Sequence, residues 1–353
     1  MKIAARRATG TGDTARIIYC PRFPRRALAR AAASRTTRVP HIPRAHPEPF
    51  ARIAGAARGV LLALAACGAV LLSGTAHADE LTGTLKKIHD DGVIALGVRE
   101  ASIPFSYFDG TRTVGYSQAI AMQIVDEIRK TLGIPQLRVH EVTVTSANRA
   151  PMLMNNQIDL ECGSTTHTVE RENVVAFSDS FFQYAVRMIT RKNSGITDFA
   201  DLAAKPVVTT AGTSDERLLR RLNTDKQLNM RILSTRDHQE AFTALKEGRA
   251  VAFVMDEPIV YGFKAADPHP DDFVVTGTPL GYEVYACMFR KGDEPFRDLV
   301  NRVIAHSQTS GDAERLYKQW FTEPIPPLGI NLNFPMSESN RALFAHPNDR
   351  ALD

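Results

Sequence analysis

Apolar residues recur with two different periods along the chain from residue 93 onward. Val93–Val98 is a continuous apolar run of the length typical of a buried strand. From Ile120 to Leu132 an apolar residue recurs at every fourth position, which predicts a helix over residues 117–132. Gly133 follows directly and is a common helix terminator.

The same alternation of strand and helix patterns continues to residue 255. It predicts further strands at 138–144, 158–162, 207–210, 230–233 and 251–255, and helices at 147–154, 166–171, 214–222 and 237–247. Strands that alternate with helices favour an α/β architecture with mainly parallel sheets.

Two longer β-rich runs, at 181–191 and 281–290, separate the alternating blocks. A chain that leaves one sheet, builds a second and returns needs two such crossings. We therefore expect a discontinuous first lobe (79–185 and 283–353) with a second lobe (186–282) inserted. Binding sites in such folds lie between domains, at the carboxyl ends of strands. The Pro- and Asn-rich tail after Trp320 is expected to cover the first lobe in extended form.

A 13-residue apolar run at 60–72 follows Arg58 and precedes Ala76-His77-Ala78. It is short for a membrane-spanning helix, which needs about 20 apolar residues. A basic flank, a short apolar core and a small-x-small site are typical of a secretory signal peptide, so we expect cleavage after Ala78 and a periplasmic protein. Leu64 to Cys67 also resembles a lipoprotein box, but the apolar run continues past Cys67, and we favour cleavage without a lipid anchor.

The charge of the chain is unevenly distributed. The 353 residues have a net charge of +4, yet residues 1–78 hold 13 basic and two acidic residues, which leaves 30 basic and 37 acidic residues for the rest. An acidic body argues against nucleic-acid binding. The chain is 44% apolar, which argues against extensive disorder in the body.

Two cysteines, Cys162 and Cys287, remain once the leader is removed. In an exported protein they form either a disulfide or two buried free thiols. The sequence contains no C-x-x-C motif and no spacing typical of metal ligands, so we expect neither a metal nor another cofactor.

Basic and hydroxyl side chains gather at predicted strand ends and helix starts, together with one carboxylate. They are Arg99, Ser146, Arg149, Ser164, Thr166, Arg171, Thr213, Ser214, His238 and Asp256. Helix N-termini favour anions and arginine holds carboxylates in a bidentate manner. Each residue taken singly is equally consistent with a helix cap or a surface ion pair, and Thr213 with Glu216 forms a capping-box pattern. Together they fit a ligand with two carboxylates and one ammonium group.

Several segments resemble a known family. They include VREASIPFSYFD (98–109), TSANRAPML (145–153), ECGSTTHTVERE (161–172), GRAVAFVMDE (248–257) and EPIPP (323–327). In order along the chain, they resemble the periplasmic solute-binding proteins of polar amino acid ABC transporters, in particular the glutamate/aspartate branch. The resemblance implies a two-lobed type II fold with two hinge strands. It also implies a monomer that binds L-glutamate or L-aspartate and delivers it to permease subunits in the inner membrane.

The resemblance also implies roles for the ten residues. Arg171, Ser164 and Thr166 would hold the α-carboxylate, and Asp256 would accept the α-ammonium. The residues around the side-chain carboxylate would be Arg99, Ser146, Arg149 and His238, with Thr213 and Ser214 as further donors. The resemblance implies a Cys162–Cys287 disulfide. His167 and Thr168 depart from the usual pair of the branch, and we expect both at the surface.

Two other function classes fit the same fold. One is an exported enzyme similar to cyclohexadienyl dehydratase, in which Asp256 or Glu257 would be a general acid. The other is an exported ligand-sensing module. The sequence offers no second acid–base pair, so we expect a binding protein rather than an enzyme.

Overall fold

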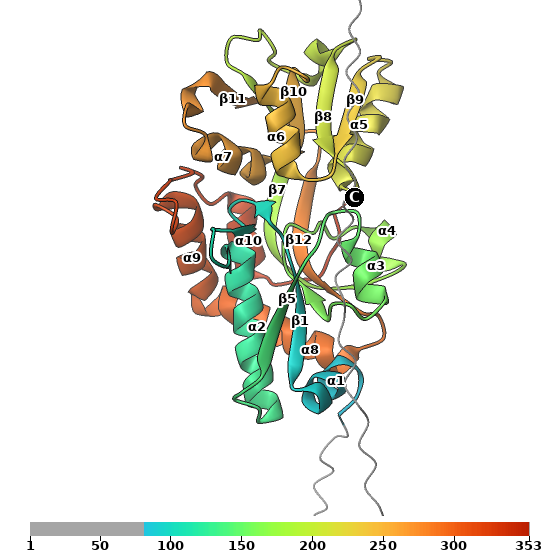
Figure 1. Ribbon diagram of the computed structural model, residues 1–353, viewed down its shortest axis with the longest axis vertical. Coiled ribbons are helices and arrows are strands. Elements are labelled where there is room, and N and C mark those ends of the chain that lie inside the picture. The colour runs from blue at the N-terminus through green and yellow to red at the C-terminus, as the bar shows by residue number, and fades with distance from the viewer. Residues whose placement is uncertain (1–80, 353) are drawn as a thin grey trace, which may run out of the picture. The chain divides into compact units, whose positions relative to one another are not determined.

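The computed structural model describes residues 81–352 (Figure 1). The predicted signal peptide, its cleavage site and Cys67 lie outside these residues. Within the described part, none of the helices combines the length and apolar character needed to span a bilayer.

Nine strands form one mixed sheet that links two lobes. Its order is β5-β1-β6-β12-β7-β10-β8-β9, with β11 also paired to β7. The bounds are β1 Val93–Val98, β5 Arg138–Thr143, β6 Leu160–Glu161, β7 Ala176–Arg191, β8 Pro206–Thr210, β9 Arg231–Thr235, β10 Ala252–Asp256, β11 Phe273–Thr276 and β12 Tyr282–Phe289. A small sheet holds β2 Ala101–Ser102, β3 Ser106–Phe108 and β4 Thr113–Val114.

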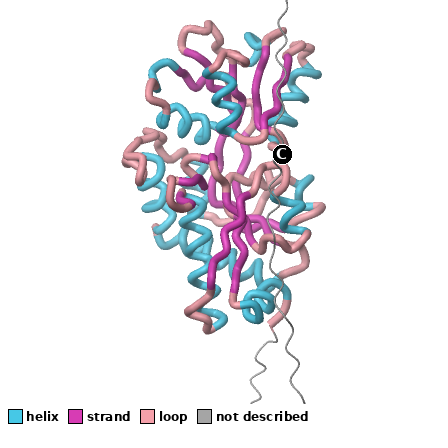
Figure 2. The backbone as a smooth tube through the Cα atoms, in the orientation of Figure 1, coloured by secondary structure: helices cyan, strands magenta, loops and turns pink. Residues whose placement is uncertain are grey.

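The long strand β7 belongs to both lobes. Residues up to Ala185 pair with β12, whereas those from Val186 onward pair with β10 and, further along, with β11. Figures 1 and 2 show β7 and β12 running between the group that contains β8–β11 and the group that contains β1 and β5. The two predicted β-rich runs are therefore the connections between the lobes.

Helices cover both parts of the sheet. Their bounds are α1 Gly83–Asp91, α2 Tyr116–Leu132, α3 Arg149–Met154, α4 Val169–Glu172, α5 Ser214–Asp225, α6 His238–Lys246, α7 Glu257–Ala266, α8 Glu294–Ser310, α9 Asp312–Tyr317 and α10 Glu338–Ala345. Short 3₁₀ turns lie at Phe199–Leu202 and Pro270–Asp272, and a π-helical turn at Lys318–Thr322.

The Pro- and Asn-rich tail at 322–335 forms no helix beyond Thr322, and the helix α10, which the sequence did not predict, follows it. Ser337 caps this helix by accepting a hydrogen bond from the Asn340 amide. The Asn340 side chain accepts a bond from the Gln183 N–H at 2.7 Å and donates to the Gln183 carbonyl at 2.8 Å. The helix is thereby fixed against β7 near the crossing between the lobes.

A buried aromatic cluster supports the start of β12. The ring of Phe105 contacts Tyr116, Phe182, Tyr285 and Phe321 edge-on, with centroids 4.8 to 6.1 Å apart. Edge-to-face pairs of this kind add roughly 0.5–1.5 kcal/mol each beyond the burial of their surface. The cluster therefore holds Tyr285 rigidly at the junction of the lobes.

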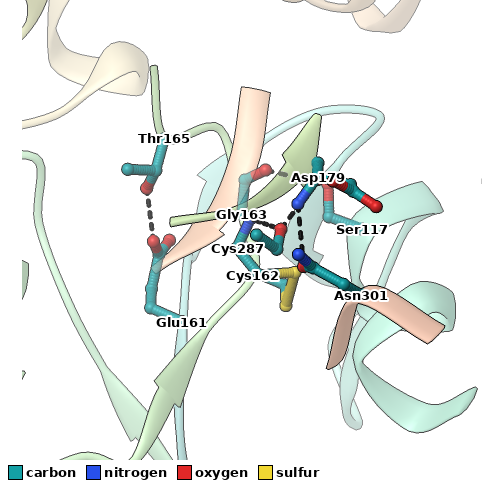
Figure 3. The surroundings of a disulfide bond; sticks show 9 residues. Ser117, Glu161, Cys162, Gly163, Thr165, Asp179, Cys287 and Asn301 are labelled. Atoms are coloured by element: carbon teal, nitrogen blue, oxygen red, sulfur yellow. Dashed lines mark hydrogen bonds between the residues drawn. A yellow bond between two sulfur atoms is a disulfide. The ribbon is translucent and has the colours of Figure 1, made fainter. Parts of the chain in front are cut away.

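The Cys162–Cys287 disulfide is present, and it joins the loop after β6 to β12 (Figure 3). The neighbouring backbone is also held, because the Cys287 N–H donates to Ser178 Oγ at 2.9 Å and Ser117 Oγ donates to the Gly163 carbonyl at 2.8 Å. These bonds fix the loop that continues into residues 164–166. The alternative of two free thiols is therefore wrong.

Replacing both cysteines with serine should lower the free energy of unfolding by about 2–5 kcal/mol, because the bridge closes a loop with a sequence separation of 125. Urea denaturation followed by circular dichroism measures this difference. A reductant should destabilise the parent protein and leave the double variant unchanged. Equal stability of the reduced and oxidised parent would contradict the prediction.

Candidate functional site

Three arginines, two buried and one half-buried, lie where the two lobes meet. Arg99 follows β1, Arg149 begins α3 and Arg171 lies in α4. Arg99 and Arg149 are each only 3% exposed. Positive charges removed from water and placed near one another are costly unless they are hydrogen-bonded and can bind anions.

Arg99 is held by the hydroxyl groups of two serines. Its Nη1 donates to Ser164 Oγ at 3.2 Å and its Nη2 to Ser146 Oγ at 3.1 Å, while Nη2 also lies 3.3 Å from His238 Nε2. Burial, with the nearby positive charge of Arg149, lowers the pKa of Arg99 to about 10. Arg99 therefore stays charged at neutral pH.

His238 approaches Arg99 from the other lobe. It is the first residue of α6, and its Nδ1 lies 2.8 Å from Thr210 Oγ1. Burial lowers the pKa of His238 well below its ordinary value, and the charges of Arg99 and Arg149 lower it further. The imidazole is neutral at physiological pH and acts through hydrogen bonds rather than charge.

Arg149 is anchored through one nitrogen. Its Nη1 donates to the Ser164 carbonyl at 3.0 Å and to Thr165 Oγ1 at 2.5 Å. Thr165 Oγ1 in turn donates to the buried carboxylate of Glu161, and Figure 3 shows these two side chains facing each other. The structure thus adds Thr165 and Glu161 to the residues that orient Arg149.

Arg171 spans the junction between the lobes. Its Nη1 donates to the Thr166 carbonyl at 2.7 Å, and its Nη2 donates at 3.2 Å to the carbonyl of Gly212, in the loop before α5. Burial lowers the pKa of Arg171 to about 10, and the charge of Arg149 contributes. Ser164, which the sequence analysis groups with Arg171 around the α-carboxylate, is hydrogen-bonded to Arg99.

A chain of hydroxyl groups connects the arginines to an acidic region. Thr166 Oγ1 lies 2.8 Å from the Tyr184 hydroxyl and 2.9 Å from Ser214 Oγ. Both of those hydroxyls donate to Glu283 Oε2, at 2.8 and 2.7 Å. Because Thr166 and Ser214 come from different lobes, this chain crosses the junction.

Three buried carboxylates form the acidic region. Asp256 ends β10, Asp215 lies in the first turn of α5 and Glu283 lies on β12. Burial raises the pKa of Asp256 to about 7, and the negative charge of Glu283 adds to this effect. Burial also raises the pKa of Asp215 well above its ordinary value, with further contributions from the other two carboxylates. The Tyr285 hydroxyl donates to Asp256.

The hydroxyl of Thr213, one of the predicted site residues, forms both of its hydrogen bonds with residues close to it in the sequence. Its Oγ1 donates to the Thr210 carbonyl at 2.7 Å and accepts from the Glu216 N–H at 3.1 Å, which caps α5. The expected capping box differs in its second half, since Glu216 Oε2 accepts from the Gly212 N–H rather than from Thr213.

The expectation that His167 and Thr168 lie at the surface is wrong. Both are buried, at 2% and 8% exposure. The His167 ring stacks on Phe177 with centroids 4.3 Å apart, and its Nε2 lies 2.6 Å from Glu172 Oε1. Thr168 caps α4 by accepting a bond from the Arg171 N–H, so it helps to position that arginine.

Comparison with known proteins agrees with this architecture. The model of the family "Bacterial extracellular solute-binding proteins, family 3" matches residues 94–323. The L-glutamate/L-aspartate-binding protein of Pseudomonas aeruginosa is 49% identical over 288 residues, which cover 81% of this chain and 95% of that protein. The glutamate/aspartate import solute-binding protein of Escherichia coli is 46% identical over 288 residues, covering 80% and 95%.

Solved structures give the same picture of the fold. A solute receptor for L-cysteine from Neisseria gonorrhoeae matches with a TM-score of 0.59 at 29% identity, covering 67% of this chain and 93% of that one. A mutant of the T. maritima protein ArgBP matches with a TM-score of 0.60 at 27% identity, covering 67% and 99%. The predicted two-lobed, type II periplasmic-binding-protein fold is confirmed. The chain belongs to family 3 of the bacterial extracellular solute-binding proteins.

Proposed function

We propose that this protein captures L-glutamate or L-aspartate in the periplasm by closing its two lobes around the amino acid. The closed form then presents the ligand to permease subunits of an ABC transporter in the inner membrane. The observation that carries the proposal is the buried junction itself, where three arginines face three carboxylates across a bridge of hydroxyl groups. The names of the two similar proteins above support the same ligands.

The arginines divide between the two carboxylates of the ligand. Arg171, with Thr166 and Ser164, holds the α-carboxylate, and its two carbonyl partners, Thr166 and Gly212, lie in different lobes. The side-chain carboxylate lies among Arg99, Ser146, Arg149 and His238. Asp256 accepts the α-ammonium, and the turn of Thr213 and Ser214 supplies further donors. Arginine suits both carboxylates because its planar fork donates two parallel hydrogen bonds.

The lobes comprise residues 79–185 with 283–353, and 186–282. Closure is a hinge motion about β7 and β12 that the ligand favours by contacting both lobes. Three contacts that join the two lobes support closure: Arg99 to His238, Arg171 to the Gly212 carbonyl, and an ion pair of 3.2 Å between Arg217 and Glu170.

Gly262 gives a test of closure away from the ligand. This glycine of α7 has no positive φ, and a Cβ added there would lie 2.5 Å from the carbonyl oxygen of Ile103 in the other lobe. Gly262→Ala should favour α7 itself, but oppose closure by about 1–3 kcal/mol and so lower glutamate affinity about tenfold. Calorimetry measures the affinity, and small-angle X-ray scattering measures closure.

The matched control is Gly281→Ala. At Gly281 an added Cβ meets only Leu218 Cδ1, at an ordinary 3.6 Å, so affinity should change little. If Gly262→Ala bound glutamate with the affinity of the parent and closed to the same extent, the proposed closed contact would be wrong.

We further propose that the mature protein is a monomeric binder without enzymatic activity, exported by a signal peptide that is cleaved after Ala78. Against the dehydratase alternative, Glu257 is engaged in an ion pair with Arg187 at 3.0 Å, and Asp256 accepts from Tyr285. Incubation with prephenate should therefore give no product. Measurable turnover would favour the enzyme.

Direct identification of the bound molecule tests the proposal. Proteins of this architecture enclose their ligand, so amino acid retained through purification is released on unfolding. Mass spectrometry of the released fraction should show glutamate or aspartate. A fraction that contained only neutral or basic amino acids would contradict the proposed ligand class.

A further inference from the structure

Asp215, Asp256 and Glu283 come from three different elements and converge on one point. One carboxylate oxygen of each lies within 4.8 Å of the others. None of the three residues is more than 6% exposed. We call this group the carboxylate triad. The assignment of the ammonium to Asp256 alone leaves the other two carboxylates without a role.

Part of the triad has no donor of its own. Among residues 81–352, no amide, hydroxyl or cationic group of another residue donates to either carboxyl oxygen of Asp215 or to the Oδ1 of Asp256, and these two carboxyls share a hydrogen bond with each other instead. The remaining contacts come from neutral groups: Tyr285 donates to Asp256, and Tyr184 and Ser214 donate to Glu283. Buried carboxylate oxygens without donors are costly, so they indicate a cationic or proton-donating partner.

Within the part of the chain that the structure describes, the charges that face the triad do not include a cation in direct contact. The guanidinium of Arg149 lowers the pKa of Asp256, but only as a minor influence, and Arg171 interacts electrostatically with Glu283. The hydroxyls of Tyr184 and Tyr285 have pKa values raised well above the ordinary value by burial, so they remain neutral donors.

The triad offers the three acceptors that a primary ammonium group needs. Such a group has three N–H donors, and charge-assisted bonds of 2.7–2.9 Å along tetrahedral directions place the three acceptors roughly 4.5 Å apart. The oxygens of the triad all lie within 4.8 Å of one another, so a single ammonium group can reach all three. Calcium, by comparison, takes about six to eight oxygen ligands.

We infer that Asp215 and Glu283, together with Asp256, bind the primary ammonium of the amino acid through all three of its N–H groups, and that the ammonium displaces a proton held by the triad in the free protein. The inference rests on the proposed function and extends it, because it adds two residues that determine specificity. It also predicts that binding is linked to pH.

The direction of the pH effect follows from charge. Burial and mutual repulsion raise the pKa of Asp256 to about 7 and that of Asp215 well above its ordinary value, so the triad holds at least one proton near neutral pH. The ammonium favours the ionised carboxylates, and the displaced proton passes to the buffer. Affinity should therefore rise with pH through about 7, by up to about tenfold per pH unit for one proton. His238 is not the source, because its lowered pKa keeps it neutral.

The parent protein, freed of ligand, is titrated at pH 6.5 in two buffers of different ionisation enthalpy. L-Glutamate is compared with (S)-2-hydroxyglutarate, in which a hydroxyl replaces the ammonium. Glutamate should release between about half a proton and one proton. The hydroxy acid should release none and bind at least about a hundredfold more weakly. Glutamate binding without proton release, or equal affinity for both ligands, would overturn the inference.

Two variants separate contact with the ammonium from structural support. Asp215→Ala and Glu283→Gln should each lower glutamate affinity about tenfold or more, and change the affinity for the hydroxy acid by less than about twofold. The control is Asp225→Ala, at the exposed end of the helix α5 that also holds Asp215. It should change neither the affinity for glutamate nor that for the hydroxy acid. Equal weakening of both ligands would show a structural role and overturn the inference.

Two further results separate an ammonium site from a metal site, and failure of the inference from failure of the proposed function. Calcium chloride is titrated into the ligand-free parent, and calcium binding that Asp215→Ala abolishes would identify a metal site instead. If the parent bound neither glutamate nor aspartate, the proposed function would fail together with the inference. If it bound them without discriminating against the hydroxy acid, only the inference would fail.

Discussion

Replacing Arg149 with alanine is expected to weaken L-glutamate binding at least about a hundredfold. The guanidinium is buried, and its Nη1 is fixed by the Ser164 carbonyl and Thr165 Oγ1. In the proposed site, the remaining donors of Arg149 bind the side-chain carboxylate of the ligand. Each charge-assisted hydrogen bond that is lost costs about 1.5–3 kcal/mol, so losing a bidentate pair gives at least this decrease.

The selectivity of the Arg149→Ala variant is as informative as its affinity. Glutamine should lose less affinity than glutamate, because its neutral amide depends less on the guanidinium. Calorimetric titrations with both ligands measure this ratio. Arg138→Ala, on the exposed side of β5, is the matched control and should bind like the parent. Parent-like glutamate affinity in Arg149→Ala would refute the role of Arg149.

Substituting lysine for Arg171 is expected to weaken binding about tenfold to a hundredfold although the positive charge is retained. Arg171 uses two nitrogens at once, one on the Thr166 carbonyl and one on the Gly212 carbonyl of the other lobe. A lysine ammonium is a compact point charge and cannot reproduce that planar fork while also holding a carboxylate. Both the contact with the ligand and the contact between the lobes should therefore suffer.

Arg217→Lys provides the control for Arg171→Lys. Arg217 also joins the lobes, through its ion pair with Glu170, but both partners are exposed, at 40% and 70%. Exposed pairs contribute only about 0–1 kcal/mol, so this substitution should change affinity by less than about threefold. Calorimetry compares the glutamate affinities of the two variants, and small-angle X-ray scattering with saturating glutamate compares how far their lobes close. If both variants lost the same small amount of glutamate affinity, the planar guanidinium of Arg171 would have no special role.

Much of the fold was predictable because its strands and helices carry clear periodic patterns. Val93–Val98 forms β1 as predicted, and the helix predicted from the pattern of Ile120 to Leu132 is α2. Helix α8 was missed although Phe296, Leu299 and Ile304 have helical spacing and bury that face. The π-helical turn at Lys318–Thr322 and the bulges between β7 and β12 depend on packing between distant segments, which no local pattern encodes.

The candidate site was predictable where its residues stand at strand ends or helix starts. The carboxylate triad was not, for two reasons. Asp215 has the pattern of an acidic residue in the first turn of a helix, which is ordinary on its own. Glu283 lies on a strand next to the lobe crossing, so only the tertiary fold brings it to Ser214. The sequence contained one weak indication of the triad. Glu283 and Tyr285 are two residues apart on one strand, so their side chains share one face of β12.

The central claim is that the buried junction binds an amino acid with two carboxylates. Calorimetric titration of the protein, freed of ligand by unfolding and refolding, with L-glutamate, L-aspartate, L-glutamine and L-arginine tests it most directly. We expect tight binding of glutamate and aspartate, and weak binding of glutamine and arginine. If glutamine or arginine bound best, the assignment of Arg99, Arg149 and His238 to a second carboxylate would be contradicted.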